Sequence, residues 1–294
     1  MKYEEFKEII KREMKERFGD TKTVIIKPVV KNNSTIYDGL IIIDPNHNVS
    51  PTIYLEYYYQ RYEDGVSIED IIEDIMIIYK ESLPTKEFDS SIFMDFNKAK
   101  SRVIMKLINT KQNQKLLEQI PYVPFYDLSI VFMVDVSQAM QERATILIYN
   151  NHMKFWDVGV EELYQLAIEN TPRQLQPRLD DLQDVVEYII GESLPFLEEL
   201  GGKILTNHLH IHGATCMVYP ELLKEIYDIF EDKVIIIPSS IHEVLVFPEK
   251  NMPDEYGLDY LRDMVKYVNE NDLASDEILS DHVYCYDGVE LINI

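Results

Sequence analysis

Residues 21–44 read TKTVIIKPVVKNNSTIYDGLIIID and predict a β-hairpin. Two runs rich in β-branched residues, 21–32 and 35–44, meet at a short polar stretch that suits a tight connection. Asparagine tolerates the positive φ angles of such turns, so Asn32 and Asn33 fit this position. Pro28 has no N–H to donate to a neighbouring strand, and it predicts that the first strand lies at a sheet edge.

Amphipathic helices are predicted on both sides of the hairpin. Ser67 and Asp70 resemble a capping box, and the isoleucines that follow recur at helical spacing. The aromatic-rich segment after the hairpin fits a helix or a strand by propensity, and we assign it to a helix. In this part of the chain we predict helices over residues 3–18, 52–62, 68–79 and 89–118.

The rest of the sequence alternates strand pairs with helices. Strands are predicted at 127–136, 143–150, 203–206, 214–219, 233–237 and 243–247, with a polar turn at 138–142 and a last strand pair from His282 onward. Helices are predicted at 160–170, 180–190, 221–230 and 258–269. Because these elements lack a regular βαβ order, we expect an α+β fold, mostly of antiparallel sheets built from short hairpins, with amphipathic helices packed on them.

A proline-containing interruption at residues 119–124 is the best candidate for a domain boundary. It divides the chain into an N-terminal α+β lobe, residues 1–118, and a C-terminal α+β lobe, residues 119–294. Composition does not change across this boundary, so one continuous domain is the alternative.

Composition predicts a cytoplasmic protein. The 294 residues include 28 lysine and arginine against 52 aspartate and glutamate residues, a formal net charge of −24. This charge repels phosphate backbones and anionic lipids, so we expect neither direct nucleic-acid binding nor membrane binding. We find no export signal and no apolar run of the ~20 residues needed to cross a bilayer. Cys216 and Cys285 lie in apolar stretches and are interpreted as reduced, buried thiols.

Three histidines, His208, His210 and His212, form the first candidate site. On a strand this spacing would place all three imidazoles on one face, about 6–7 Å apart at successive positions. Neighbouring pairs could then bind zinc or a similar metal. No carboxylate completes a known ligand pattern, so the alternative is a solvent-facing strand or loop with Leu209 and Ile211 packed beneath it.

The second candidate site is the pair His242 and Glu243, within the stretch PSSIHEVLVFP at residues 238–248. A zincin motif is excluded, because Val246 stands where the second histidine is required. If this segment is a strand, each ionisable group enters from an apolar side, an environment that favours acid/base catalysis. The alternative is that both residues form hydrogen bonds with backbone groups of the turn.

An aromatic segment provides a candidate surface for partner binding. Tyr57, Tyr58, Arg61 and Tyr62 lie within six residues, and tyrosine and arginine are favoured at the centres of protein interfaces. The expected partner is another protein or a second copy of this chain. Only 10 glycines are present, which argues against a glycine-rich phosphate loop, and no cofactor is predicted.

Several short strings carry a resemblance to a known family. They are Lys31-Asn32-Asn33, PTIYLE at 51–56, PSSIHEV at 238–244, and Leu279-Ser280-Asp281 with Tyr284 and Asp287. With these strings the chain resembles, over nearly its whole length, an uncharacterised bacterial family defined by a domain of unknown function. The resemblance implies a single-family cytoplasmic protein rather than a fusion of known modules, and it brings no activity, substrate or cofactor.

Two functional hypotheses result. In the first, the protein is non-catalytic and binds another protein, or itself, through aromatic surface such as residues 57–62; one version is an acidic mimic of nucleic acid that captures a basic partner. In the second, it is a hydrolase-like enzyme centred on His242 and Glu243, with a metal at the three-histidine stretch.

Overall fold

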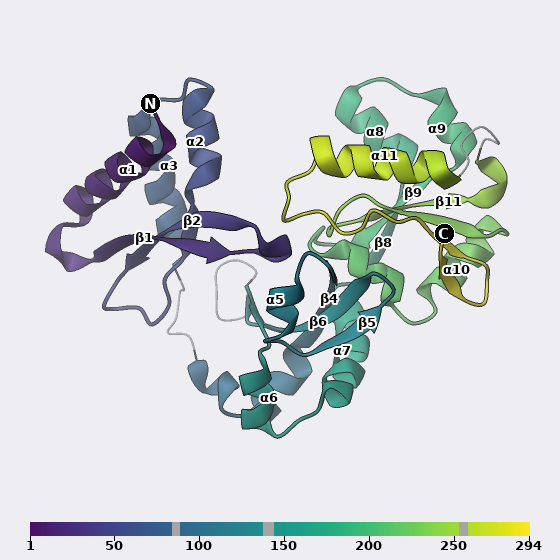
Figure 1. The fold of residues 1–294 in the computed structure, drawn as a ribbon, viewed down its shortest axis with the longest axis horizontal. Helices are drawn as coiled ribbons and strands as arrows, with labels where there is room; N and C mark the ends of the chain where they lie inside the picture. The colour runs from purple at the N-terminus through teal and green to yellow at the C-terminus, as the bar shows by residue number, and fades with distance from the viewer. Residues whose placement is uncertain (84–88, 138–143, 253–257) are drawn as a thin grey trace. The chain divides into compact units, whose positions relative to one another are not determined.

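In the computed structural model, residues 21–44 form the hairpin that their sequence predicts (Figure 1). Its strands are β1 (Thr23–Val30) and β2 (Ile36–Ile43), paired antiparallel. In the connection between them Asn33 has a φ angle of 56°, the conformation that asparagine tolerates. A third strand, β3 (Thr52–Tyr54), pairs with β2, so the order β1-β2-β3 confirms the edge position predicted from the proline in β1.

The structure describes residues 1–83, 89–137, 144–252 and 258–294, which fall into two units. The first unit comprises Met1–Asp95 and Asp135–Ile146, and the second comprises Phe96–Val134 and Leu147–Ile294. Antiparallel sheets of hairpins with packed helices confirm the α+β prediction. The predicted boundary after residue 118 falls inside the second unit, where β4 (Val103–Asn109) pairs along its whole length with β6 (Leu128–Asp135).

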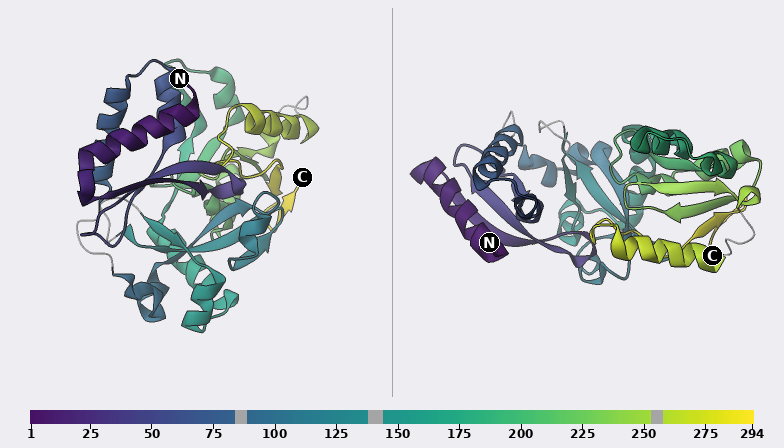
Figure 2. Two further views of the ribbon diagram at one scale, coloured as in Figure 1. Left: turned by 60° about the vertical axis from the view of Figure 1, so that its left-hand side comes forward. Right: turned by 90° about the horizontal axis from the view of Figure 1, so that it is seen from above.

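The first unit packs its helices on the hairpin. Its helices are α1 (Tyr3–Phe18), α2 (Leu55–Glu63) and α3 (Ile68–Glu81). Ser67 Oγ accepts the N–H of Asp70 at 3.1 Å, which confirms the predicted start of α3. In the left view of Figure 2, α1 runs across one face of the hairpin, where its apolar side joins α3 and the inward residues of the strands in one core.

The second unit contains two sheets. One has the order β4-β6-β5, with β5 at Tyr122–Phe125. The short strand β7 (Thr145–Leu147) spans the point at which the chain passes from the first unit to the second. The other has six strands in the order β13-β12-β10-β11-β9-β8; these are β8 (Pro177–Asp181), β9 (Lys203–Asn207), β10 (Val234–Pro238), β11 (Val244–Pro248), β12 (Tyr284–Tyr286) and β13 (Leu291–Asn293).

Helices cover both faces of the six-stranded sheet. Helices α8 (Leu182–Ile190), α9 (Pro195–Leu200) and α11 (Leu258–Asn271) lie on one face, and α10 (Leu222–Phe230) lies on the other (Figure 1). The remaining helices of this unit are α4 (Phe96–Ala99), α5 (Gln114–Leu117), α6 (Asn150–Trp156) and α7 (Val160–Gln174). Within the described ranges, no helix combines the length and apolar character needed to span a membrane.

Three of the predicted segments adopt a different secondary structure, and β5, β8, α6 and α9 were not predicted. Residues 103–109, expected in a helix, form β4, whose residues are almost all buried, so its apolar run shows no period-two alternation. Residues 214–219, expected as a strand, lie mostly in a buried 3₁₀ helix, Gly213–Val218. The first three residues of the helix expected at 52–62 are strand β3. The turn expected at 138–142 lies outside the described residues.

Candidate functional site

The predicted pair His242 and Glu243 lies in the bend that joins β10 to β11. The carbonyl oxygen of Glu243 accepts the N–H groups of Ser239 and Ser240 at 3.3 and 3.2 Å. Ser240 Oγ accepts the N–H of His242 at 2.9 Å. In the part of the chain that the structure describes, no hydrogen bond or ion pair joins the two side chains, so they do not form an acid/base dyad.

The imidazole of His242 instead faces two other residues. Its Nδ1 accepts the backbone N–H of His212 at 3.2 Å, and the two rings stack with centroids 5.8 Å apart. Because Nδ1 accepts this bond, the neutral ring carries its proton on Nε2, 3.9 Å from Oε1 of Glu277. The Nδ1 lone pair is thus engaged by the backbone, while 34% of the side chain remains exposed.

The three-histidine stretch is not a strand. Strand β9 ends at Asn207, and His210 and His212 have φ angles of 54° and 52°, so the prediction that three imidazoles share one strand face is wrong. The Asn207 side chain causes this turn, because it accepts the N–H of Leu209 at 3.0 Å and donates to the carbonyl of Ile211 at 2.8 Å. Among the described residues, no group of three or more histidine, cysteine or acidic side chains could hold a metal ion.

The predicted aromatic surface lies largely inside the first unit. Tyr58 is 3% exposed and belongs to its core, and Tyr62 packs against the same core. Arg61 forms an ion pair with Asp74 at 2.7 Å and lies over the Tyr57 ring. Tyr57, with 63% of its surface exposed, is the member that presents most of its ring to solvent.

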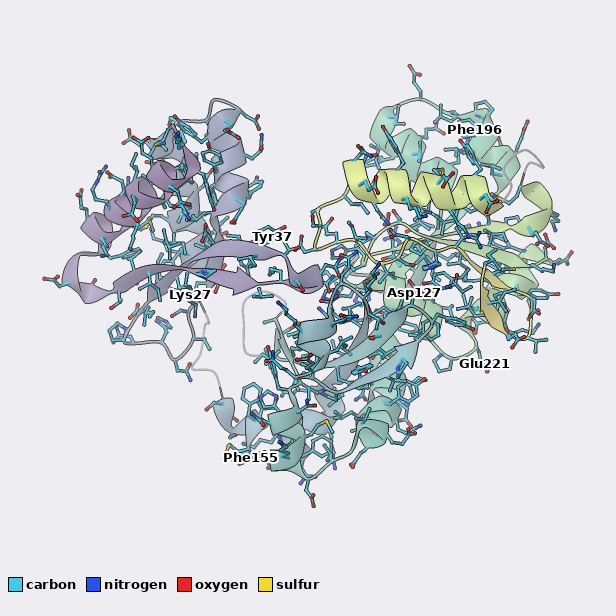
Figure 3. All side chains as sticks on the ribbon, in the orientation of Figure 1. Lys27, Tyr37, Asp127, Phe155, Phe196 and Glu221 are labelled. Atoms are coloured by element: carbon cyan, nitrogen blue, oxygen red, sulfur yellow. The ribbon has the colours of Figure 1, made fainter. Side chains whose placement is uncertain are left out.

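A polar cluster that the sequence analysis did not predict as a site surrounds Asp127, in the turn between β5 and β6 (Figure 3). Its Oδ2 accepts the hydroxyl of Ser280 at 2.6 Å, and its Oδ1 accepts the hydroxyl of Tyr284 at 2.5 Å. His282 Nδ1 lies 3.2 Å from Oδ2. Burial, with the Asp127 carboxylate beside the ring, raises the pKa of Tyr284 and keeps this phenol neutral.

This cluster contains serine, histidine and aspartate, but its hydrogen bonds are not those of a catalytic triad. In a triad the serine donates to the histidine, which is held by the aspartate. Here Ser280 donates to Asp127 directly at 2.6 Å and is 1% exposed. The same ring nitrogen of His282, Nδ1, faces both Ser280 Oγ at 3.5 Å and Asp127 Oδ2 at 3.2 Å, whereas a triad uses one ring nitrogen for each. The arrangement binds the β5–β6 turn to the segment that leads into β12, and it acts as a structural clamp.

Large exposed apolar side chains gather on α8, α9 and the loop between them. Four large apolar side chains are exposed there: Tyr188 (90%), Ile189 (73%), Ile190 (58%) and Phe196 (56%). Residues 179–202 contain seven acidic residues and no lysine or arginine. We call this the α8–α9 surface; its exposed acidic members are Asp184, Glu187, Glu192, Glu198 and Glu199, and Phe196 is labelled in Figure 3.

Sequence reasoning missed these features for identifiable reasons. Asp127 and Tyr284 are 157 residues apart, and no local pattern marks such a pair. Glu277 is one acidic residue among 52. The α8–α9 surface did leave a signal, since Tyr188, Ile189 and Ile190 are consecutive in a helix and cannot all face one core.

Comparison with known proteins identifies one family. A family model described as "Family of unknown function (DUF5688)" matches residues 3–288, nearly the whole chain. No curated protein and no solved structure matches the chain.

Proposed function

This chain belongs to the DUF5688 family, a family of unknown function, and we propose that it is a non-catalytic protein that binds a basic partner protein through the α8–α9 surface. The observation that carries the proposal is the exposure of four large apolar side chains within an acidic segment that lacks any lysine or arginine. Large apolar side chains exposed among charged ones are typical of protein interaction sites.

The two components of this surface would contribute differently to binding. Burial of a large apolar side chain contributes about 1.5–3 kcal/mol relative to exposure, so Tyr188, Ile189 and Phe196 would supply most of the affinity. The surrounding carboxylates would attract a basic partner and increase its association rate. A second copy of this chain would bring two acidic surfaces together, so charge favours a different, basic protein.

We also propose a cytoplasmic location. Cys216 and Cys285 are both buried and both free thiols, and reduced cysteines are typical of proteins in a reducing compartment.

The binding proposal is tested with a defined probe. An 18-residue helical peptide with leucine on one face and lysine on the other is titrated against the full chain by fluorescence anisotropy, beside a matched peptide with glutamate in place of lysine. We expect the lysine peptide to bind more tightly, with an affinity that falls as salt increases. Equal affinity for the two peptides would contradict the proposal.

Matched variants locate the site. Ile189→Ser removes an exposed apolar side chain from the α8–α9 surface, and Phe155→Ser removes one of similar exposure (65%) from α6. We expect Ile189→Ser to weaken peptide binding about tenfold, near 1.4 kcal/mol, and Phe155→Ser to leave it unchanged. A dimer in sedimentation analysis that Ile189→Ser dissociates would show that the occupant is a second copy instead.

The hydrolase hypothesis centred on His242 and Glu243 is the alternative, and the geometry favours it less. His242 uses its Nδ1 to hold the backbone of His212, and Glu277 rather than Glu243 faces its Nε2. His242→Ala is therefore expected to lower the free energy of unfolding. A hydrolytic activity of the purified chain that is lost in His242→Gln, with folding intact, would favour the enzyme instead.

A further inference from the structure

One face of the six-stranded sheet is only partly covered by its helices. Helix α8 packs on β8 and β9 at one side of this face, and α11 lies toward the other side (Figure 2, right view). Leu245, on β11 between β10 and β9, belongs to the core of this face and remains partly exposed. A partly exposed side chain near the middle of a sheet indicates that the helices on either side do not close over it.

The apolar side of α8 continues beyond the part that packs on the sheet. Leu182 and Val186 pack in the core of this face. Ile189 follows three residues after Val186 and seven after Leu182, so it lies on the same side of the helix. It is nevertheless 73% exposed. The last turn of α8 therefore presents to solvent the side that its first turns bury against the sheet.

The flank of α11 that faces α8 is apolar. Arg262 marks the opposite flank, because its Nε donates to the carbonyl oxygen of Ile294 at 3.1 Å, directly after the edge strand β13. Strands β13 and β8 are the two edges of this sheet, and α8 packs at the β8 edge. Met264 (37% exposed) and Tyr267 (65%) lie roughly opposite Arg262 on a helix of 3.6 residues per turn, and so they point toward α8.

The charges around this apolar surface are mostly negative. Helix α11 adds two exposed acidic residues, Asp263 and Glu270, to those of the α8–α9 surface, and neither forms an ion pair within the described ranges. The two cations of α11, Arg262 and Lys266, lie toward its other flank, and Arg262 is paired with Asp259 at 3.0 Å. A second copy would bring acidic residues together, so this charge selects a basic occupant.

We propose that the α8–α9 surface and the adjoining flank of α11 form one docking site, which binds a basic amphipathic helix of the partner protein. This inference rests on the proposed function and specifies the form of the partner. The apolar side of the partner helix lies against Ile189, Met264 and Tyr267 and covers Leu245. Its lysine and arginine side chains lie along both margins, beside the carboxylates of α8, α9 and α11.

A helix suits this site better than an extended segment. The site consists of helix surfaces, and helices use their backbone N–H and C=O groups internally, so it offers side chains rather than backbone partners. A strand bound here would leave its own backbone groups without partners as they leave water. A helix satisfies those groups itself, and it completes the layer of helices on this face of the sheet.

Variants of α11 test the extent of the site. The 18-residue leucine–lysine peptide is titrated by fluorescence anisotropy against Tyr267→Ser and against Tyr57→Ser, a control of nearly equal exposure (63%) in the first unit. We expect Tyr267→Ser to weaken binding about tenfold, as for an apolar anchor of an interface, and Tyr57→Ser to leave it unchanged. Met264→Gln, a second variant of the same flank, should weaken binding in the same direction. Unchanged affinity in both α11 variants overturns the proposal.

A second peptide tests the requirement for a helix. It has the same leucine and lysine residues with two central prolines, which prevent helix formation. We expect it to bind at least about tenfold more weakly than the helical peptide, since it has to leave backbone groups unpaired at the site. Equal affinity of the two peptides overturns the proposal that the occupant is a helix.

The outcome with Ile189→Ser separates this inference from the proposed function. If Ile189→Ser weakens the helical peptide while both α11 variants bind it normally, the α8–α9 surface binds a partner and the extension to α11 is wrong. If Ile189→Ser also binds normally, both proposals fail. Weaker binding in Ile189→Ser, Tyr267→Ser and Met264→Gln, with Tyr57→Ser unaffected, supports a single site that includes both helices.

Discussion

Removal of the Asp127 carboxylate is expected to destabilise the second unit strongly. Asp127 accepts hydroxyl groups from Ser280 and Tyr284, and both of these residues are at most 1% exposed. In Asp127→Ala these buried hydroxyls lose their acceptor, and water has little access to replace it. We therefore expect a cost well above that of an ordinary surface substitution.

The magnitude follows from the geometry of the cluster. A hydrogen bond to a charged group contributes about 1.5–3 kcal/mol, which gives about 3–6 kcal/mol for the two bonds. The Tyr284 hydroxyl lies 3.2 Å from Ser280 Oγ, so one of the two groups keeps a partner in the variant. We expect Asp127→Ala to cost about 3 kcal/mol and Tyr284→Phe about 1.5 kcal/mol, because Asp127 retains two other donors in the second variant.

The chain provides its own probe for this measurement. Trp156 is the only tryptophan, it is 7% exposed, and it belongs to the second unit. Its fluorescence during urea unfolding therefore reports on the unit that contains Asp127. With a urea m value of about 2–3 kcal/mol/M, a loss of about 3 kcal/mol lowers the midpoint by about 1–1.5 M.

A matched variant and a double variant make the reasoning refutable. Tyr286→Phe removes a hydroxyl from the same strand, one that donates no hydrogen bond to Asp127, and it should leave the midpoint unchanged. The double variant Asp127→Ala/Tyr284→Phe should lose less stability than the sum of the two single variants, since the bond from Tyr284 to Asp127 is already absent in Asp127→Ala. Fully additive losses of stability in the double variant, or a midpoint shift below about 0.3 M for Asp127→Ala, would refute the proposal that Asp127 clamps these segments together.

Three further predictions concern other parts of the chain. A Cβ at Gly213 would lie 2.3 Å from the carbonyl oxygen of His242, so Gly213→Ala should cost about 1–3 kcal/mol in the same urea assay; an unchanged midpoint would contradict this packing. The Lys22 ammonium and the backbone N–H of Asn46 lower the pKa of Asp44 to about 2, so its stabilisation is complete above pH ~4 and is lost as the pH falls toward 2. Asp44→Asn should flatten the acid unfolding curve of the first unit in that window, as followed by circular dichroism, and an identical curve would argue against this ion pair. Burial raises the pKa of Cys216 to about 12, so Ellman's reagent at pH 8 should label this thiol only when urea unfolds the chain; rapid labelling of the native protein would show that the thiol is accessible.

Local patterns of apolar residues correctly predicted the elements that have one side toward the core and the other toward solvent. The hairpin and α3 each have one side toward the core and one toward solvent, so their apolar residues recur with a readable period. Strand β4 is buried on both sides, and its run VIMKLIN carries no alternation that separates a strand from a helix. The strand predicted at 214–219 was wrong for the same reason. Its apolar residues are buried in a 3₁₀ helix, and a buried strand would show the same apolar run.

The candidate sites were less predictable, because their geometry depends on contacts between distant residues. The sequence shows His242 beside Glu243, whereas the fold places it against His212, 30 residues earlier, and near Glu277. Proximity along a chain says little about which side chains meet when a bend separates them. The strand assumed for the three histidines depended on spacing alone, and the Asn207 side chain provided a turn that this spacing does not reveal.

The hydrogen bonds within the second unit bear on where its function lies. The groups most suggestive of chemistry, His242 and Asp127, direct their polar atoms at the protein itself, one at the backbone of His212 and the other at two buried hydroxyls. These contacts hold together segments that are distant in the sequence. The large apolar side chains of α8 and α9 face solvent instead, and this contrast supports the proposal that the protein binds a partner there.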